Sequence, residues 1–147
     1  MSVPNDLKRL HRYFFPKVIV RRGVKRKKVT QATAKKLAQH KEAARALVHA
    51  RLEHFNAHYG LTYHRVAIRA QRSRWGSCSK KGNLNFNFAL LFLPQELSDA
   101  VIVHELCHLK EFNHGRAFWK LMSETIPDYA DRKSKLARTH PDKMVTA

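Results

Sequence analysis

Two histidines and a glutamate stand close together in the run His104-Glu105-Leu106-Cys107-His108. In a helix, residues four apart differ by about 40° around the axis and about 6 Å along it, so both imidazoles can reach one metal ion from the same face. Glu105 lies about 100° around the helix from His104, outside the ligand pair but close enough to touch a water molecule on the metal. The spacing therefore predicts two metal ligands and one general acid or base.

A catalytic zinc ion needs a third protein ligand and one open position. His114 is the leading candidate, provided that the helix turns before it, because a continuous helix would place it about 9 Å beyond His108 along the axis. Asn113 and Gly115 flank His114, and we expect them to provide that turn through a left-handed helix cap. The predicted site therefore holds one Zn²⁺ ion between His104, His108 and His114.

Other donors remain as alternatives to His114. Glu111 lies about 10 Å along the helix axis from His104, so we expect an outer or solvent-facing carboxylate there. Glu124, on the following helix, would match metallopeptidases whose third ligand is a distant glutamate. Cys107 and Cys78 are soft donors, but Cys107 is explained more simply as a small buried helix residue.

The helices and strands that must position these residues are predicted from the periodicity of apolar residues and from residues that end helices and strands. The predicted helices cover residues 30–58, 94–112, 116–125 and 129–138, with a frayed tail after the last. The predicted strands cover residues 63–70, 74–78 and 83–88, and the last of them alternates strictly between polar and apolar residues. Leu84, Phe86 and Phe88 should share its buried face, with three asparagines on the other.

The chain has 147 residues, and its 29 basic against 11 acidic side chains give a formal charge of +18. This length fits one domain, and the charge suits an anionic partner such as a nucleic acid or a nucleotide. Six cations fall within residues 21–28, where they could bind phosphates or form a solvated linker. They are Arg21, Arg22, Lys25, Arg26, Lys27 and Lys28.

Composition also restricts where the protein works. Two cysteines are too few for a disulfide-stapled secreted scaffold, and no signal peptide or membrane span is recognisable. We therefore expect a soluble, cytoplasmic monomer that does not contact a membrane. Its predicted organisation is a basic segment over residues 1–30, a catalytic domain over residues 31–140 and a tail over residues 141–147.

Several separated blocks of sequence, spread over about residues 31–137, occur together in a fixed order. They are Arg74-Trp75-Gly76-Ser77-Cys78; Gly82, Asn87 and Leu90; Val103 to Leu109; Asn113-His114; and Phe118-Trp119. In these blocks the chain resembles the YgjP-like family of small zinc metallopeptidases. More distantly it resembles the SprT-like proteases, some of which act on proteins crosslinked to DNA.

This resemblance implies a zincin-like α+β fold. It would have a long N-terminal helix, a small antiparallel sheet above a helix that carries the ligands, and one or two further helices. The resemblance also implies zinc bound by His104, His108 and His114, with Glu105 as the general acid or base.

The expected reaction is hydrolysis of a peptide bond by a water molecule that Glu105 deprotonates. The strand over residues 83–88 is expected to pair with the substrate peptide. Arg74, Trp75 and Asn87 match motif positions and are candidate substrate contacts.

Two alternative functions remain open. The same metal site could hydrolyse a phosphoester or phosphoanhydride, since a highly positive surface attracts nucleotides. The chain could instead be a basic nucleic-acid-binding protein with a structural metal, or a peptidase that also binds DNA.

Overall fold

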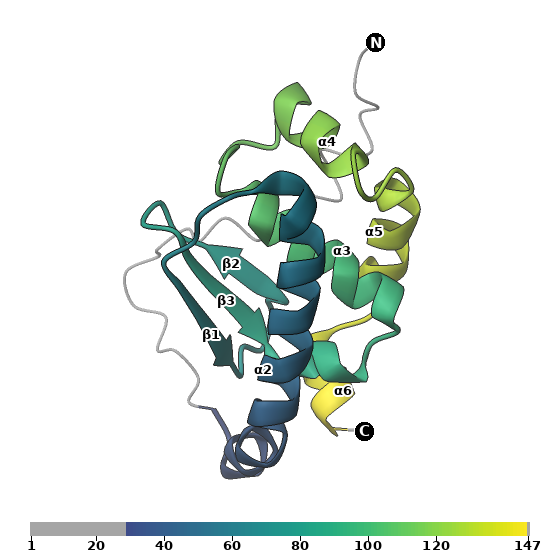
Figure 1. Cartoon of the computed structure of the whole chain (residues 1–147). Coiled ribbons are helices and arrows are strands. Elements are labelled where there is room, and N and C mark those ends of the chain that lie inside the picture. The colour runs from purple at the N-terminus through teal and green to yellow at the C-terminus, as the bar shows by residue number, and fades with distance from the viewer. Residues whose placement is uncertain (1–28, 147) are drawn as a thin grey trace, which may run out of the picture.

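The computed structural model describes residues 29–146 of the chain (Figure 1). Its elements are α2 (Gln31–Tyr59), β1 (Arg65–Arg69), β2 (Gly76–Cys78), β3 (Asn83–Asn87), the 3₁₀ helix η1 (Phe88–Phe92), α3 (Gln95–Cys107), α4 (Arg116–Ser123), α5 (Tyr129–Ala137) and α6 (Pro141–Thr146). A small sheet surrounded by helices is an α+β fold, as predicted. The basic cluster at residues 21–28 lies outside the described residues, so its role stays a prediction.

The long helix α2 begins and ends at residues that the sequence marks. The side chain of Thr30 accepts a hydrogen bond from the Thr33 backbone N–H, which caps the first turn. Gly60 ends the helix with a left-handed backbone (φ 60°), which glycine adopts without a steric penalty. Four residues along one stripe are buried in the core: Ala44, Val48, Leu52 and Phe55.

The sheet is mixed and not antiparallel throughout, which corrects the predicted topology. Its strand order is β1-β3-β2, with β3 antiparallel to β2 but parallel to β1. A tight turn with Gly82 at φ 79° joins β2 to β3 as a hairpin. Residues 70–75 connect β1 to β2, and the chain returns through β3 in the direction of β1. Only the local hairpin was readable from the sequence.

This order places β3 in the centre of the sheet, with its backbone paired to β1 on one side and to β2 on the other. The prediction that residues 83–88 pair with a substrate peptide is therefore wrong, because a central strand has no free edge. The predicted buried face is confirmed: Leu84, Phe86 and Phe88 are all fully buried.

Helix α3 runs through the middle of the molecule, with the sheet on one side and α5 on the other (Figure 1). Every residue from Leu97 to His108 is buried. Such a helix has no solvent face, so its polar residues need partners inside the protein. Asp99 has one in Arg51 of α2, which donates from Nε and Nη2 to the two carboxylate oxygens at 2.7 and 2.9 Å.

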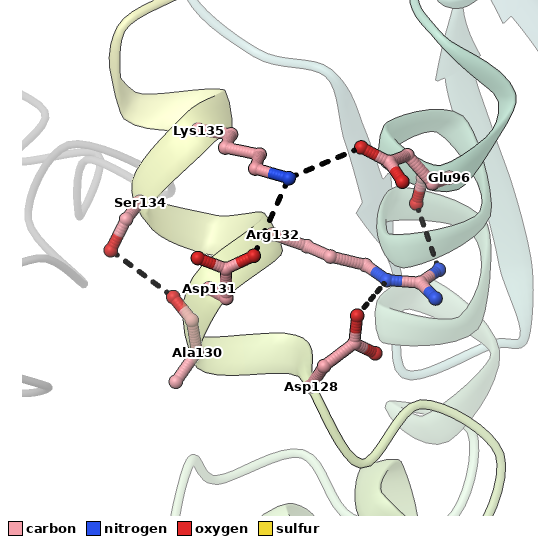
Figure 2. Close-up of polar contacts among 7 residues, drawn as sticks. All are labelled: Glu96, Asp128, Ala130, Asp131, Arg132, Ser134 and Lys135. Atoms are coloured by element: carbon pink, nitrogen blue, oxygen red, sulfur yellow. Dashed lines mark hydrogen bonds and ion pairs between the residues drawn. The ribbon is translucent and has the colours of Figure 1, made fainter.

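Two C-terminal helices complete the fold around α3. Helix α5 packs on α3, and exposed ion pairs and hydrogen bonds join its outer side to Glu96 (Figure 2). The predicted tail over residues 141–147 is instead largely helix α6, whose Val145 is only 7% exposed and part of the core. No helix within residues 29–146 is long and apolar enough to cross a membrane.

Candidate metal centre

The side chains of His104, His108 and His114 converge in the structure. The Nε2 atom of His104 lies 2.9 Å from Nε2 of His108 and 3.1 Å from Nε2 of His114. The three residues form the one group of potential metal-ligating side chains found within residues 29–146. The sequence prediction of these three positions as one cluster is thus matched by the geometry.

The helix that carries the first two histidines ends earlier than predicted. Helix α3 stops at Cys107, five residues before Phe112, and His108 is its C-terminal cap. Hydrogen bonds from Leu109 N–H and Lys110 N–H to carbonyls three residues back tighten the last turn. The chain then bends back through residues 111–115, so that His114 reaches the pair.

The predicted left-handed cap is not used in this bend. Asn113 does not have a positive φ, and Gly115 has φ −84° in an extended conformation at the start of α4. The bend was therefore predicted correctly, but its backbone mechanism was wrong.

Each histidine also has a contact outside the cluster, through a ring nitrogen in His104 and His108 and through the backbone in His114. His104 Nδ1 lies 2.7 Å from the Tyr129 hydroxyl, and His108 Nδ1 lies 3.0 Å from the Glu111 carbonyl oxygen. A carbonyl oxygen can only accept, so Nδ1 of His108 carries a proton, and in the neutral ring Nε2 then presents a lone pair. The indole N–H of Trp119 donates to the His114 carbonyl at 3.0 Å.

These contacts fit a bound divalent cation. Nitrogen lone pairs that face each other at about 3 Å repel unless a proton or a metal ion lies between them, and neutral imidazoles are the ligand form that zinc accepts. Phe118 packs against all three imidazoles: its ring is fully buried, and its centroid lies 4.7 to 4.9 Å from theirs.

Glu105 lies beside the cluster and has an unusual environment. It is 1% exposed, and neither carboxylate oxygen has a hydrogen-bond partner among the described residues. Burial raises the pKa of this carboxyl well above its usual value, while the charge of Arg74 acts in the opposite direction. Burying an unpaired carboxylate costs free energy, so Glu105 does not stabilise the fold, and a catalytic role explains its position better.

Gly76, at the start of β2, gives Glu105 its space. A Cβ atom at this position would lie 2.9 Å from the Glu105 Cγ and 3.1 Å from its Oε1. Since β2 is at an edge of the described sheet, the contact also places a free strand edge next to the carboxylate. Gly76 is part of the motif that carries the family resemblance, but the sequence alone predicted no role for it.

The alternative ligands lie elsewhere. Glu124 binds His58 through its Oε2, at 2.9 Å from the imidazole Nε2, and is not in the metal-ligating group. Neither Cys78 nor Cys107 belongs to that group, although both are free thiols. Glu111 contacts His108 through its backbone carbonyl, and its carboxylate is not in the metal-ligating group.

The three candidate substrate contacts have different surroundings. Trp75 is 4% exposed and belongs to the core. The side-chain amide of Asn87 donates both hydrogens, to the carbonyls of Gln71 and Arg74, and its oxygen accepts from Ala89 N–H. Both amide hydrogens of Asn87 are thus used within the protein and Trp75 has little exposed surface, so structural roles account for both side chains. Arg74 is half-buried and acts electrostatically on Glu105.

Tyr129 and Phe118 were not recognised as parts of the site. Tyr129 is 25 residues from His104 in the sequence, and a tyrosine at the start of a helix is not a recognisable signal. Phe118 was quoted in a motif, but its apolar side chain suggested only the core.

The fold and the convergent histidines are those of a zincin-like, metal-dependent peptidase, and the comparisons support this class. A family model described as the YgjP-like metallopeptidase domain matches residues 14–139, so the chain belongs to the YgjP-like family. The match begins at residue 14, before the region where the resemblance was noticed. Peptidases of this family act on peptides or proteins.

Among solved structures, the chain is similar to the crystal structure of the metallopeptidase zymogen abylysin from Pyrococcus abyssi. The two share 26% sequence identity with a TM-score of 0.56, over 60% of this chain and 90% of that chain. No significant match was found among curated proteins.

Proposed function

We propose that this protein is a zinc-dependent endopeptidase in which Glu105 is the general base and acid. The observation that supports this most is the convergence of three imidazole nitrogens, 2.9 and 3.1 Å apart, in the same site as a buried, unpaired carboxylate. No residue of the described chain adds a fourth donor to that group. A three-ligand set leaves one position for water or substrate, as catalytic zinc sites require.

Zinc bound in this way would lower the pKa of water and polarise the peptide carbonyl. The protein supplies the proton transfers. Glu105 would accept a proton from the attacking water at one carboxylate oxygen and deliver it to the leaving amine nitrogen. Its raised pKa suits this task, because a carboxylate in water is too weak a base.

The edge strand β2 is the proposed place for the substrate backbone. Within the described sheet β2 pairs with β3 alone, so its other edge can accept a peptide as an added strand. The close approach of Gly76 to Glu105 supports this assignment, because a peptide on that edge would pass beside the base. Arg74, next to β2, is the remaining candidate for a contact with the substrate carbonyl.

The test combines zinc analysis with two assays. Purified protein should contain one zinc ion per chain and cleave unfolded casein, with no phosphate release from nucleoside triphosphates. Glu105→Gln should lower casein cleavage by about 10² to 10⁴-fold and keep its zinc. Glu111→Gln, which leaves the backbone contact to His108 in place, is the matched control and should remain active.

His114→Ala identifies the third ligand. This variant should lose stoichiometric zinc, and full retention would contradict the three-histidine site. Phosphate release that depends on Glu105, without casein cleavage, would replace the peptidase with the phosphohydrolase alternative. DNA binding by the basic cluster is a separate prediction, to be tested by the salt dependence of affinity.

A further inference from the structure

Helix α5 contains a lysine in a position that stability alone does not explain. Lys133 is 1% exposed, and its Nζ atom has no hydrogen-bond partner within residues 29–146. Burial lowers the pKa of its ammonium group to about 8, so the group is still mostly charged at pH 7. A buried cation without a partner destabilises a fold, and an apolar side chain of similar volume would pack there at lower free energy.

The ammonium group of Lys133 lies over an aromatic ring. Its Nζ is 5.1 Å from the centroid of the Trp119 ring, within the range of a cation–π interaction. The Nε1–H group of the same indole donates to the His114 carbonyl at 3.0 Å. A cation over the ring draws electron density from the indole and makes this N–H a stronger donor.

The position of His114 depends more on such a hydrogen bond than the positions of His104 and His108 do. His104 and His108 are fixed by helix α3, whereas His114 lies in the irregular segment between α3 and α4. The Trp119 indole holds that segment by its backbone, and Lys133 holds the indole. His114 is thus connected to α5 through the indole ring of Trp119.

The same face of α5 also contacts a second proposed ligand, His104. Tyr129, one turn before Lys133, contacts His104 Nδ1 with its hydroxyl and lies 5.4 Å from the Trp119 ring. The outer face of α5 is joined to α3 by Arg132, which donates to the Glu96 backbone carbonyl at 3.0 Å (Figure 2). Helix α5 is therefore fixed relative to the helix that carries His104 and His108.

We propose that Lys133 is a positioning residue for the third metal ligand, which it acts on by holding and polarising the Trp119 indole that binds the His114 carbonyl. This inference rests on the metal site proposed above. In this proposal the buried amine of Lys133 increases metal affinity and lowers the stability of the fold. One substitution should therefore move these two properties in opposite directions.

The deciding variant is Lys133→Met, which keeps an unbranched side chain, one atom shorter, and removes its charge. We expect the metal-free variant to unfold at a higher denaturant concentration than the wild type, and its zinc Kd, measured by chelator competition, to be about 10 to 100-fold higher. In ¹H–¹⁵N spectra the indole N–H of Trp119 should move upfield as its hydrogen bond weakens. The indole of Trp75, the other tryptophan, is the internal reference.

Two further variants separate a positioning role from simple packing. Lys133→Arg keeps a cation over the ring and should restore the zinc Kd to within a few-fold of the wild type. Lys135→Met removes the same charge from an exposed position on α5 and should change neither the Kd nor the Trp119 signal. In a double-mutant cycle, Trp119→Phe and Lys133→Met should be less than additive in zinc affinity, because both act through the same indole.

The inference fails if Lys133→Met binds zinc with the wild-type Kd, or if its Trp119 signal is unchanged. Should this variant not fold, Lys133→Gln is measured in the same way and carries the same expectations. Absence of zinc binding by the wild-type protein would instead reject the proposed function. In that case the Trp119 signal of the metal-free protein still tests the contact between Lys133 and the indole.

Discussion

The ring nitrogens of the three histidines meet because each residue is held at a second point. For His108 that point is a backbone carbonyl, for His104 a tyrosine hydroxyl, and for His114 an indole N–H on its backbone. Contacts on a ring nitrogen, as in His104 and His108, select the tautomer and direction of a ligand ring, and losing one typically weakens metal binding by about 10 to 100-fold.

Replacing Tyr129 tests the support of His104. Tyr129→Phe removes the oxygen that faces His104 Nδ1 but keeps the ring in the core, so we expect the zinc Kd to rise by about 10 to 100-fold. Chelator competition measures the change. Tyr59→Phe removes a hydroxyl that hydrogen-bonds instead to the Leu121 carbonyl and to Thr125, and should lower stability by about 1 kcal/mol and leave the Kd unchanged. Equal zinc affinity in both variants would remove Tyr129 from the site.

Gly76→Ala tests the space around Glu105. The new methyl group would lie 2.9 Å from the Glu105 Cγ and must displace the carboxylate, so we expect kcat to fall by about 100-fold while zinc stays bound. Steady-state kinetics measure kcat, and metal analysis measures the bound zinc. Gly115→Ala is the control, because a Cβ there meets nothing within 4 Å and its φ is negative. An active Gly76→Ala enzyme would show that Glu105 can act from another position.

At the scale of elements, the site depends on how α3 is held. Its buried residues contact α2, α4, α5 and the strands β2 and β3, so packing on every side sets its position. The polar links to α3 differ in burial: the Arg51 and Asp99 side chains are 22% and 9% exposed, whereas Lys135 and Glu96 are about half exposed (Figure 2). Ion pairs of these two kinds contribute very differently to stability.

Breaking each link should show this difference. Arg51→Met leaves the buried Asp99 carboxylate without its partner, and we expect the free energy of unfolding to fall by about 3 kcal/mol. Lys135→Met breaks an exposed pair and should lower it by less than about 1 kcal/mol. Urea denaturation of the metal-free proteins measures both values. Similar losses in the two variants would mean that burial does not govern these ion pairs.

At the scale of the whole molecule, the hydrophobic core does not include the three histidines, although Phe118 and Tyr129, which contact them, belong to it. It extends from α2 through the sheet and α3 to α5 and α6, and its members are aliphatic and aromatic side chains. A chain of this length can bury enough apolar surface to fold without a metal. The histidines also have protein contacts that hold their rings in the absence of an ion.

Chelation should therefore abolish peptidase activity but not the fold. With EDTA we expect an unchanged far-ultraviolet circular dichroism spectrum and a lower melting temperature. The lost stability should approach about 4 kcal/mol, relative to protein with free zinc at 1,000 times its Kd. Addition of zinc should restore activity. Unfolding of the chelated protein would instead indicate a structural metal, as in zinc fingers.

Regular backbone geometry allowed the sequence to determine relations within single elements. The spacing of His104 and His108 on one helix face and the buried side of β3 follow from 3.6-residue and 2-residue periods. These patterns also carried the family resemblance.

Only the tertiary structure decided relations between elements. The central place of β3, the end of α3 at Cys107 and the burial of Tyr129 and Lys133 beside the histidines each result from contacts between distant segments. Such contacts are set by the joint packing of many side chains, and no local spacing encodes them. The sequence therefore identified the three histidines that converge, whereas packing determined which residues contact them and which strand edge lies beside Glu105.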